Sequence, residues 1–399
     1  MSACQEKVPI WRIVLLFIAC LSVYMYLYTN AFDNMRTSSV YRVVEGDLQA
    51  VLKDKIGSIS YYLRLMEQSD NSLKIAVSSS AAGKPTINTT RASAVTTKPT
   101  TKAPTTQSLA SISALLREKF KSEIEAGTVK PLLTLFTSWN ENSEKSLVHK
   151  LTVTNWNSLK PFIVPLIFTN DSSVAKECSN SGWEARNISV AAADGIPVLK
   201  YMYKDAIANY NSTFYAYANG DILFNEKLVN TLMFLLNSTV DLSSPVLIVG
   251  RRTNVDNVTY EEGSAWDNIT KAARSRGKLF TGWAEDYFIT TRGYPWKDIA
   301  EVVIGRRAYD NWLVYHSRKS KFTVIDVSMT VLAVHQTTKS GNFEGHQHPN
   351  RDYNHNLLVK MYKRIKYNAG VIECIDKATE YEHNVLQVKT RKVHNSCSV

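Results

Sequence analysis

The sequence predicts an α/β domain built on a mostly parallel sheet flanked by helices, preceded by an N-terminal transmembrane helix and a stem. Three observations support this prediction. Short apolar runs such as residues 162–168 (FIVPLIF) alternate with helix-like segments through the body of the chain. An uncharged apolar segment lies near the N-terminus, and a Ser/Thr/Pro-rich segment separates it from the body. Strands that are apolar on both faces and are separated by helices are typical of a parallel sheet covered on both sides.

The composition is that of a globular protein with a sizeable core. The chain has 399 residues, of which 44% are hydrophobic and 10% aromatic, and its formal net charge is +11. The basic residues are dispersed, with clusters only near the C-terminus. Such a distribution favours a solvated basic face, or attraction to nucleotide phosphates or acidic glycans, over nucleic-acid binding. We therefore expect no nucleic-acid partner.

Cysteine usage excludes a fold held together by many disulfides. Of the five cysteines, Cys4 and Cys20 lie before and within the apolar N-terminal segment, which leaves Cys178, Cys374 and Cys397 for the body. Three cysteines allow one disulfide and leave one thiol, and the sequence does not say which two pair. Zinc-ligand spacings are absent from the sequence.

Residues 10–29 are predicted to be a transmembrane signal anchor. They contain the uncharged run IVLLFIACLSVYMYLY, which with its apolar flank approaches the roughly 20 residues that span a bilayer. Lys7 and Arg12 precede the run, and Asp33 is the first charge after it. This asymmetry predicts a cytosolic tail at residues 1–9 and a body across the membrane. A cleaved signal peptide is the alternative, but the tyrosines that end the run favour an uncleaved anchor.

Glycosylation sequons agree with a body in the secretory lumen. Seven N-x-[S/T] sequons are present, a number only somewhat above chance, and they begin at Asn88, Asn170, Asn187, Asn211, Asn237, Asn257 and Asn268. We therefore expect a single-pass type II protein of the Golgi or endoplasmic reticulum membrane, with its main domain in the lumen.

Two further segments connect the anchor to the body. Residues 30–77 are predicted to be a helical stem, whose apolar positions follow a 4-3-4-3 spacing at 52, 56, 59, 63 and 66. That seam could pair two stems into a homodimer, or pack on the protein's own domain. Residues 78–108 are rich in Thr, Ser and Pro and lack aromatic and acidic residues. We expect them to form a disordered, O-glycosylated stalk.

The catalytic domain is expected at residues 109–370, followed by a basic C-terminal tail at residues 371–399. Helices are predicted at residues 109–125, 146–159, 198–210 and 225–236, and strands at 131–136, 162–168, 214–218 and 245–249. A later apolar run, residues 323–334, is predicted to be one more strand. In parallel α/β sheets ligands bind at the carboxyl ends of the strands. The residues that follow each run are therefore candidate site residues.

Polar and aromatic side chains occupy these positions. Thr137 and Trp139 follow the first strand, Asp171 follows the second, and Asn219-Gly220-Asp221 follows the third. A carboxylate on a tight turn at a strand end can bind a divalent cation that bridges a diphosphate. The alternative is that Asn-Gly-Asp forms only a turn, because all three residues favour turns.

Four segments, in the expected order, resemble those of GT-A-fold nucleotide-sugar glycosyltransferases. YAYANGDILF (215–224) resembles the metal-binding D-x-D segment, with Asp221 at the last aspartate. FTGWAEDYF (280–288) resembles the acceptor-side loop and strand, and GRRAYDNWL (305–313) resembles the helix start that carries a catalytic carboxylate. VHQ (334–336) resembles the strand whose histidine completes the metal site. The resemblance covers about half of the chain, residues 130–336, and departs from the family at Asn219, which replaces the first aspartate.

The resemblance implies a role for each candidate residue. Asp221 and His335 would hold a divalent metal, Mn²⁺ or Mg²⁺, and Asp310 would be the catalytic base, with Asp286 a less favoured second candidate. Asp310 could instead be an N-terminal helix cap, a first-turn helix acid or a member of an ion pair. The expected donor-binding residues are Thr137, Trp139, Asp171, Lys200, Asn219, Arg251, Arg252 and Arg306. The expected acceptor-binding residues are Gly282, Trp283, Tyr287 and Trp312, although the aromatic ones could equally pack in the core.

The implied function is metal-assisted transfer of a sugar, of the hexosyl or N-acetylhexosaminyl class, from a nucleotide-sugar donor to a hydroxyl of a glycan or glycoprotein in the secretory lumen. Two alternatives stay open. One is a non-catalytic luminal protein of the same fold that binds a glycan or sugar nucleotide, which Asn219 supports. The other is a hydrolase that uses paired carboxylates.

Overall fold

The computed structural model describes residues 106–339, 341, 347–382 and 385–399. The predicted cytosolic tail, transmembrane anchor and helical stem, and nearly all of the predicted stalk, lie outside these residues, and these predictions stay predictions. Among the helices of the described residues, none combines the length and apolar character needed to cross a membrane.

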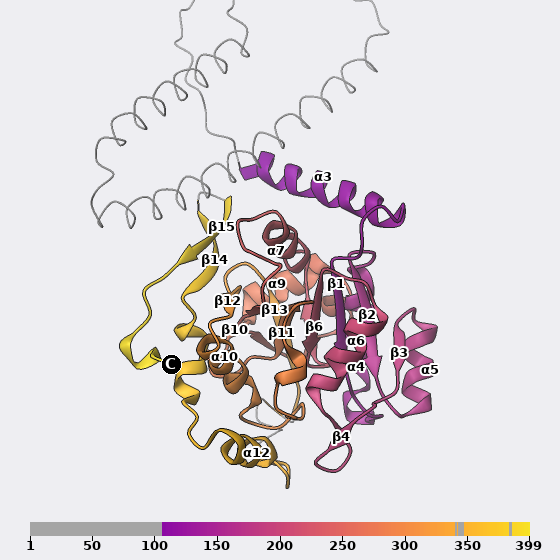
Figure 1. The fold of residues 1–399 in the computed structure, drawn as a ribbon. Coiled ribbons are helices and arrows are strands. Elements are labelled where there is room, and N and C mark those ends of the chain that lie inside the picture. Colours follow the sequence, from indigo (N-terminus) through magenta and orange to yellow (C-terminus); the bar gives the residue numbers. More distant parts are fainter. Residues whose placement is uncertain (1–105, 340, 342–346, 383–384) are drawn as a thin grey trace, which may run out of the picture. The chain divides into compact units, whose positions relative to one another are not determined.

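A nine-stranded sheet forms the centre of the described domain (Figure 1). Its strands lie in the order β15-β14-β12-β8-β11-β6-β1-β2-β3. They are β1 (Leu133–Thr137), β2 (Ile163–Phe168), β3 (Glu184–Arg186), β6 (Phe214–Ala218), β8 (Val246–Val249), β11 (Tyr287–Thr291), β12 (Thr323–Asp326), β14 (Lys377–Glu382) and β15 (Val385–Thr390). Only β11 and β15 run antiparallel to their neighbours, so the prediction of a mostly parallel α/β sheet is confirmed.

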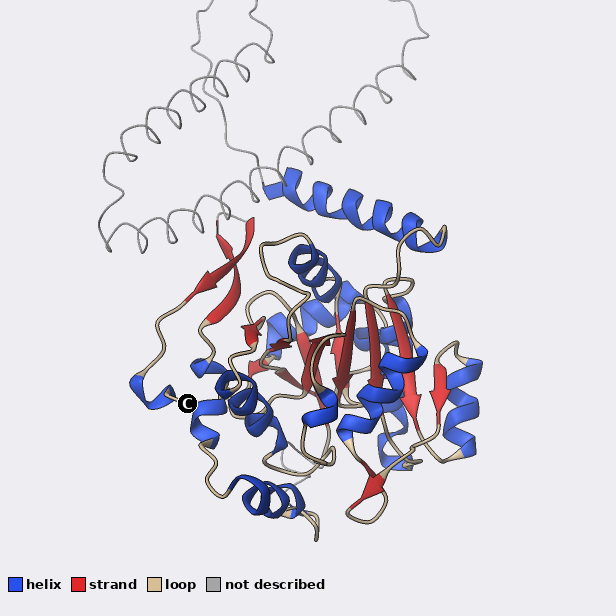
Figure 2. Cartoon of the chain, in the orientation of Figure 1, coloured by secondary structure: helices blue, strands red, loops and turns tan. Residues whose placement is uncertain are grey.

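Helices cover both faces of this sheet (Figure 2). Helices α4 (Ser146–Ser158) and α7 (Lys227–Leu236) share one hydrophobic cluster with inward-facing strand residues such as Leu135. Helices α6 (Leu199–Asn209) and α10 (Tyr309–Lys319) share a second cluster, to which the next strand residue, Phe136, belongs. Successive residues of a strand point to opposite faces, and this is why a continuous apolar run was needed at each central strand.

The elements predicted between residues 109 and 249 are present, with ends displaced by a few residues. The first helix is α3 (Thr106–Glu125). Several elements have no counterpart in the prediction, namely α5 (Ser172–Asn180), β4 (Ala191–Ala192), β5 (Ile196–Pro197), α8 (Tyr260–Gly263), α9 (Trp266–Arg276) and α12 (Tyr353–Tyr362).

A second, four-stranded sheet lies beside the first and was not predicted. Its order is β10 (Lys278–Leu279), β9 (Thr253–Asp256), β13 (Ala333–Thr337) and β7 (Ile222–Phe224). The prediction of a single strand at residues 323–334 is therefore wrong, because β12 belongs to the large sheet and β13 to the small one. The chain turns after β12, where Asp326 Oδ1 accepts a hydrogen bond from Ser328 N at 2.9 Å. A side chain that bonds the backbone two residues on favours a turn over a continued strand.

Residues 371–382 and 385–399 belong to the fold and are not a separate tail. β14 pairs in parallel with β12, and β15 pairs antiparallel with β14, so both extend the large sheet. Cys374 and Cys397 form a disulfide, and Cys178 is the buried free thiol. The predicted boundary at residue 370 does not separate two parts of the structure. β14, which follows it, pairs with β12, which precedes it, and so covers the open edge of β12.

Candidate active site

A pocket of about 720 Å³ lies where the large and small sheets meet. It is lined by residues that follow β1, by the turn after β6, by the loop before β11, by the start of α10 and by His335 of β13. These are mostly strand ends and helix starts, the positions at which α/β sheets bind ligands.

The small sheet brings Asp221 and His335 together. His335 lies opposite Ile222 in the β13–β7 ladder, and Gln336 N donates to Asp221 O at 3.0 Å. As a result, His335 Nε2 lies 3.3 Å from Asp221 Oδ2, while His335 Nδ1 lies 3.2 Å from Thr337 Oγ1. Burial alone would raise the pKa of Asp221, but the neighbouring imidazole outweighs it and lowers this pKa to about 2. Asp221 is therefore a carboxylate across the physiological pH range.

The chemistry of this pair fits a divalent cation. Asp221 Oδ1 is buried and has no hydrogen-bond partner in the described part of the chain, so one ligand oxygen is available. No cluster of three or more His, Cys, Asp or Glu side chains suited to a metal occurs among the described residues. A two-residue site suits Mg²⁺ and similar ions that take their remaining ligands from water and substrate phosphates.

Asn219 positions a neighbouring carboxylate. Its Oδ1 accepts from Tyr217 Oη at 2.9 Å, and its Nδ2 donates to Asp286 Oδ1 at 2.7 Å. Its backbone N–H donates to Asp286 O at 2.9 Å. Both ends of the amide are thus occupied within the protein, and an aspartate at this position would face Asp286 with a like charge.

Asp286 is also paired with a cation. Arg252 Nη1 lies 2.5 Å from Asp286 Oδ2, and both side chains are almost fully buried. The guanidinium lies over the Phe280 ring, 4.5 Å from its centroid. Burial raises the pKa of Asp286, and the charge of Arg252 opposes that rise. Since Asn219 and Arg252 each engage one carboxylate oxygen, Asp286 has little capacity left to accept a substrate proton.

Asp310 is a weakly engaged carboxylate of the pocket. It lies in the first turn of α10, and its Oδ1 accepts from Asn311 N at 3.0 Å. The N-cap position belongs to Ala308, in the left-handed conformation (φ 84°), so Asp310 is not the capping residue. No ion pair of Asp310 occurs in the described part of the chain, where Arg307 pairs with Asp352 instead. Burial raises the pKa of Asp310 to about 7, assisted by the charge of Asp286.

Glu285 is a pocket carboxylate that the sequence analysis did not select. It is 2% exposed, and its Oε2 accepts from Asn311 Nδ2 at 3.0 Å. Its Oε1 is buried without a hydrogen-bond partner among the described residues. Burial, and then the charge of Asp310, raise the pKa of Glu285 well above its usual range. The raised pKa favours the protonated form of Glu285, whose only sequence signal was its position beside Asp286.

Nine of the residues proposed from the sequence line the pocket. They are Trp139, Asn219, Asp221, Arg252, Trp283, Asp286, Arg306, Asp310 and His335. Trp139 stacks on His149 with ring centroids 4.5 Å apart, whereas the Trp283 indole is 50% exposed. Of these two indoles, Trp283 is the one with a large exposed ring face on which a ligand could stack, because one face of Trp139 is covered by His149.

The other seven proposed residues do not line the pocket. They are Thr137, Asp171, Lys200, Arg251, Gly282, Tyr287 and Trp312. Lys200 pairs with Glu301 at 3.1 Å, and Asp171 caps α5 by accepting from Ser173 N at 2.9 Å. Tyr287 and Trp312 are buried in the core, which was the alternative for the aromatic residues. The sequence showed which side chains follow strands and which are charged. It did not show which of these side chains are already engaged by an ion pair or a hydrogen bond with a neighbouring residue.

Other pocket residues were missed by the sequence analysis. Besides Glu285, the main polar ones are Lys145, His149, Arg307, Asn311 and His348. Lys145 and His149 lie at the start of α4, which follows β1, so a search extended beyond the first residues after each strand would have included them.

No protein-family model and no curated protein matches the chain. It is similar to solved structures that include residues 1–349 of S. aureus TarS, with 10% identity over 31% of this chain and 36% of that chain, at a TM-score of 0.23. It is also similar to glucosyl-3-phosphoglycerate synthase from Mycobacterium tuberculosis in complex with Mg²⁺ and uridine diphosphate, with 11% identity over 68% of this chain and 92% of that chain, at a TM-score of 0.33. The match thus spans little more than a third of the TarS chain. Because these TM-scores are below 0.5, the functional proposal rests on the pocket's own side chains.

Proposed function

We propose that the protein is a metal-assisted glycosyltransferase, which moves a sugar from a nucleotide-sugar donor to a hydroxyl group of a glycan or glycoprotein. One observation carries the proposal. The same pocket holds a metal-suited pair, Asp221 and His335, and a partly buried, weakly engaged carboxylate, Asp310. Glycosyl transfer needs these two functions, because a diphosphate must leave while a hydroxyl loses its proton.

The donor side is formed around Asp221 and His335. A divalent cation, Mn²⁺ or Mg²⁺, bound by these two residues would neutralise the charge that develops on the leaving diphosphate. Thr337 contacts His335 Nδ1 and so orients Nε2 toward Asp221. The stacked Trp139 and His149 rings, and Arg306, are the remaining side chains that we assign to the donor.

The acceptor side is formed around Asp310. The acceptor oxygen forms its bond to the anomeric carbon, the bond to the diphosphate breaks, and the hydroxyl proton moves to the Asp310 carboxylate. A base with a pKa of about 7 is matched to neutral pH. The raised pKa of Glu285 favours its protonated form, which would have an O–H to donate to the acceptor, and the exposed indole of Trp283 offers a platform for a sugar ring.

We further propose that this reaction takes place in the lumen of the Golgi or endoplasmic reticulum, on a type II protein, with a sugar of the hexosyl or N-acetylhexosaminyl class. The uncharged N-terminal run and its flanking charges support the location. Five of the six sequon asparagines in the described part of the chain are exposed, as glycan attachment requires. Pairing of two stems into a homodimer stays a prediction.

Binding of UDP- and GDP-sugars to the purified full chain, with and without Mn²⁺, tests the function. We expect Mn²⁺-dependent binding and release of the nucleotide when an acceptor mixture is added, because the cation and the diphosphate share one site. Asp221→Ala and chelation should each abolish both signals. Asp267→Asn, an exposed aspartate of α9, is the matched control and should retain them. Transfer that survives both Asp221→Ala and a chelator would refute the metal model.

A non-catalytic binding protein is the second candidate. Two observations favour it: the amide at position 219, and the absence of a third metal-suited side chain beside Asp221 and His335 among the residues that the structure describes. It predicts metal-independent glycan binding without nucleotide release. A hydrolase, in contrast, would release free sugar in the absence of any acceptor.

A further inference from the structure

The C-terminal segment lies against the part of the pocket that carries Glu285 and Asp310. We infer that this segment, held by the Cys374–Cys397 disulfide, positions the acceptor wall of the pocket. We call residues 370–376 and 391–397 of this segment the brace. The acceptor wall consists of residues 280–286 and 308–311. The inference deepens the proposed function, since it assigns the alignment of the acceptor residues to a region outside the pocket.

The brace contacts the acceptor wall first at the loop before β11. Ile372 N donates to Gly282 O at 3.0 Å. The Glu373 carboxylate fills the space beside Gly282, where a Cβ atom would collide with it. Arg251 connects the same carboxylate to the loop, because its Nη1 lies 3.9 Å from Glu373 Oε1 and its Nε donates to Phe280 O at 2.6 Å. The loop that leads into Glu285 is therefore bound to the brace at two points.

The second contact is with the start of α10. Gly370 packs so closely on the backbone of Asn311 that a Cβ atom at position 370 would collide with the Asn311 carbonyl oxygen. Asn311 Nδ2 in turn donates to Glu285 Oε2 at 3.0 Å, and Asp310 is its chain neighbour. A shift of Gly370 would therefore change the position of Asp310 relative to Glu285.

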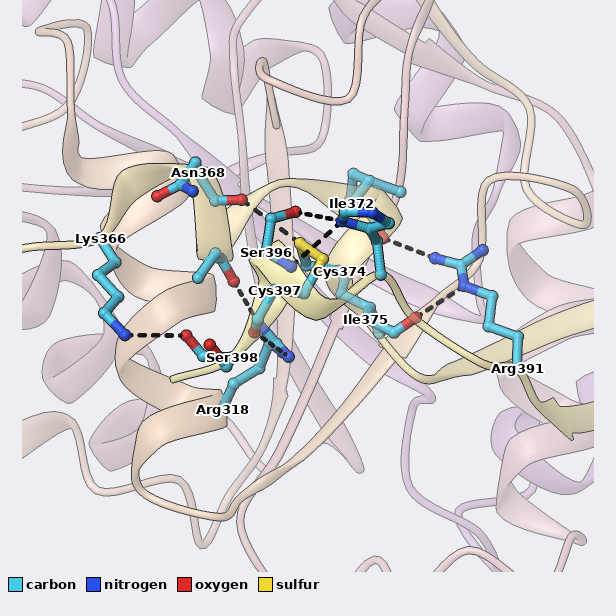
Figure 3. Close-up of a disulfide and its surroundings, with 12 residues drawn as sticks. Arg318, Lys366, Asn368, Ile372, Cys374, Ile375, Arg391, Ser396, Cys397 and Ser398 are labelled. Carbon is cyan, nitrogen blue, oxygen red and sulfur yellow. Dashed lines mark hydrogen bonds between the residues drawn. A yellow bond between two sulfur atoms is a disulfide. The ribbon is translucent and has the colours of Figure 1, made fainter.

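Two arginines and the disulfide hold the brace itself (Figure 3). Arg391 donates to Ile372 O at 2.6 Å and to Ile375 O at 2.7 Å. Arg318, near the end of α10, donates to Cys397 O at 2.9 Å. These bonds join the last residues of the chain to the residues that touch the acceptor wall, and the disulfide closes the loop covalently.

The disulfide lies outside the two main hydrophobic clusters. Its two cysteines form a separate buried cluster with Val371, against which Val393 packs. So few apolar side chains contribute little hydrophobic stabilisation around Cys397. The cross-link therefore ties the last residues of the chain to the stretch that carries Ile372 and Ile375, which are buried in the second main cluster. We therefore expect loss of the disulfide to loosen the brace while the large sheet stays folded.

Comparison of Cys374→Ser/Cys397→Ser with the wild-type full chain tests the inference. We expect faster hydrogen exchange of the acceptor-wall amides, and a fall in kcat/KM for the acceptor on the order of tenfold or more, because a small misplacement of reacting groups is costly. Mn²⁺-dependent nucleotide binding should not change, since the brace contacts neither Asp221 nor His335. Cys178→Ala, which removes the free thiol and keeps the disulfide, is the control and should match the wild type.

Gly370→Ala provides a second variant in which the disulfide is intact, and it should produce the same pattern through the collision with Asn311. Unchanged hydrogen exchange at the acceptor wall in both variants would overturn the inference. A loss of nucleotide binding as large as the loss of kcat/KM for the acceptor would also overturn it, because the segment would then support the whole domain. Absence of sugar transfer by the wild type would contradict the proposed function. The inference about the brace would still be tested, because hydrogen exchange is measured without a substrate.

Discussion

The carboxylates of the pocket differ in charge because their neighbours differ. Asp221 lies beside an imidazole, and its pKa is lowered to about 2. Asp310 is partly buried and forms no ion pair in the described part of the chain, and its pKa is raised to about 7. Two carboxylates whose pKa values are pushed apart can take different roles in one reaction. The first is suited to bind a cation, and the second is suited to exchange a proton.

Asp310→Asn tests the second role. The variant keeps the shape of the side chain and removes its basicity, so we expect kcat to fall by about 10²- to 10⁴-fold while nucleotide binding is retained. In the wild type, kcat/KM should decline as the pH falls below about 7, because the base becomes protonated. A pH–rate profile and steady-state kinetics measure both effects. Near-normal transfer by the variant would remove Asp310 from the mechanism.

The same residue links pH to stability. The pKa of Asp310 is about 7 in the folded protein and 3.8 in the unfolded chain. Below about pH 4 the carboxyl is protonated in both states, so burying it costs the folded protein no charge. Stability is then lost as the pH rises toward about 7, where the folded protein must bury a charge. Asp310→Asn should therefore be more stable than the wild type at pH 8, by on the order of a few kcal/mol, and equally stable near pH 4. Thermal unfolding at the two pH values shows whether this holds.

At the scale of elements, side chains of α4 hold β7, the three-residue strand that directly follows Asp221. Asn155 Nδ2 donates to Phe224 O at 2.9 Å, and Phe224 N donates to Asn155 Oδ1 at 2.8 Å. The buried amide thus pairs with β7 as a neighbouring strand would. Trp156 Nε1 adds a bond to Ile222 O at 2.9 Å. Because the same strand pairs with β13, these helix side chains fix the position of Asp221 relative to His335.

Asn155→Leu should be strongly destabilising, although it conserves volume. It leaves a buried N–H and a buried C=O of Phe224 without partners, and each such group costs about 1–3 kcal/mol. We expect a lower denaturation midpoint and weaker Mn²⁺-dependent nucleotide binding, since β7 loses its support. Lys150→Ala, an exposed position on the same helix, should change the unfolding free energy by less than about 0.5 kcal/mol. Equal effects of the two substitutions would argue against this role of Asn155.

At the scale of the whole molecule, the sequons connect the fold to the proposed location. The side chains of Asn187, Asn211 and Asn257 are exposed and make no hydrogen bond within the described part of the chain. All six sequons of that part are carried by the domain that contains the pocket, so a glycan on any of them would place the pocket in the lumen.

Glycosidase treatment of the full chain, expressed in cells with a secretory pathway, tests this location. We expect an N-glycosidase to lower the apparent mass, and the triple variant Asn187→Gln/Asn211→Gln/Asn257→Gln to show a smaller shift. Asn209→Gln, at the end of α6 and outside any sequon, is the control and should shift as the wild type does. An unglycosylated chain would contradict the luminal location, and would leave the pocket chemistry to be judged by the metal experiment.

The sequence by itself determined the elements and their class. Apolar runs and helical periodicity depend on neighbouring residues, so they identified β1, β2, β6 and β8 and the helices α4, α6 and α7, and the mostly parallel sheet followed. The same local signals placed Asp221 at a strand end, whereas the family resemblance placed Asp310 at a helix start. They did not reveal the split of residues 323–334 between two sheets, nor the strands of the C-terminal segment.

Tertiary structure decided which of these residues meet, and what each one can do. Pairing of β7 with β13 brings His335 to Asp221, and the fold selects Cys374 and Cys397 as the disulfide. Pairing partners, burial and neighbouring charges involve residues far apart in the chain, and these three factors set each pKa. Asp286 and Asp310 look alike in sequence, yet one is held by Arg252 and the other is not.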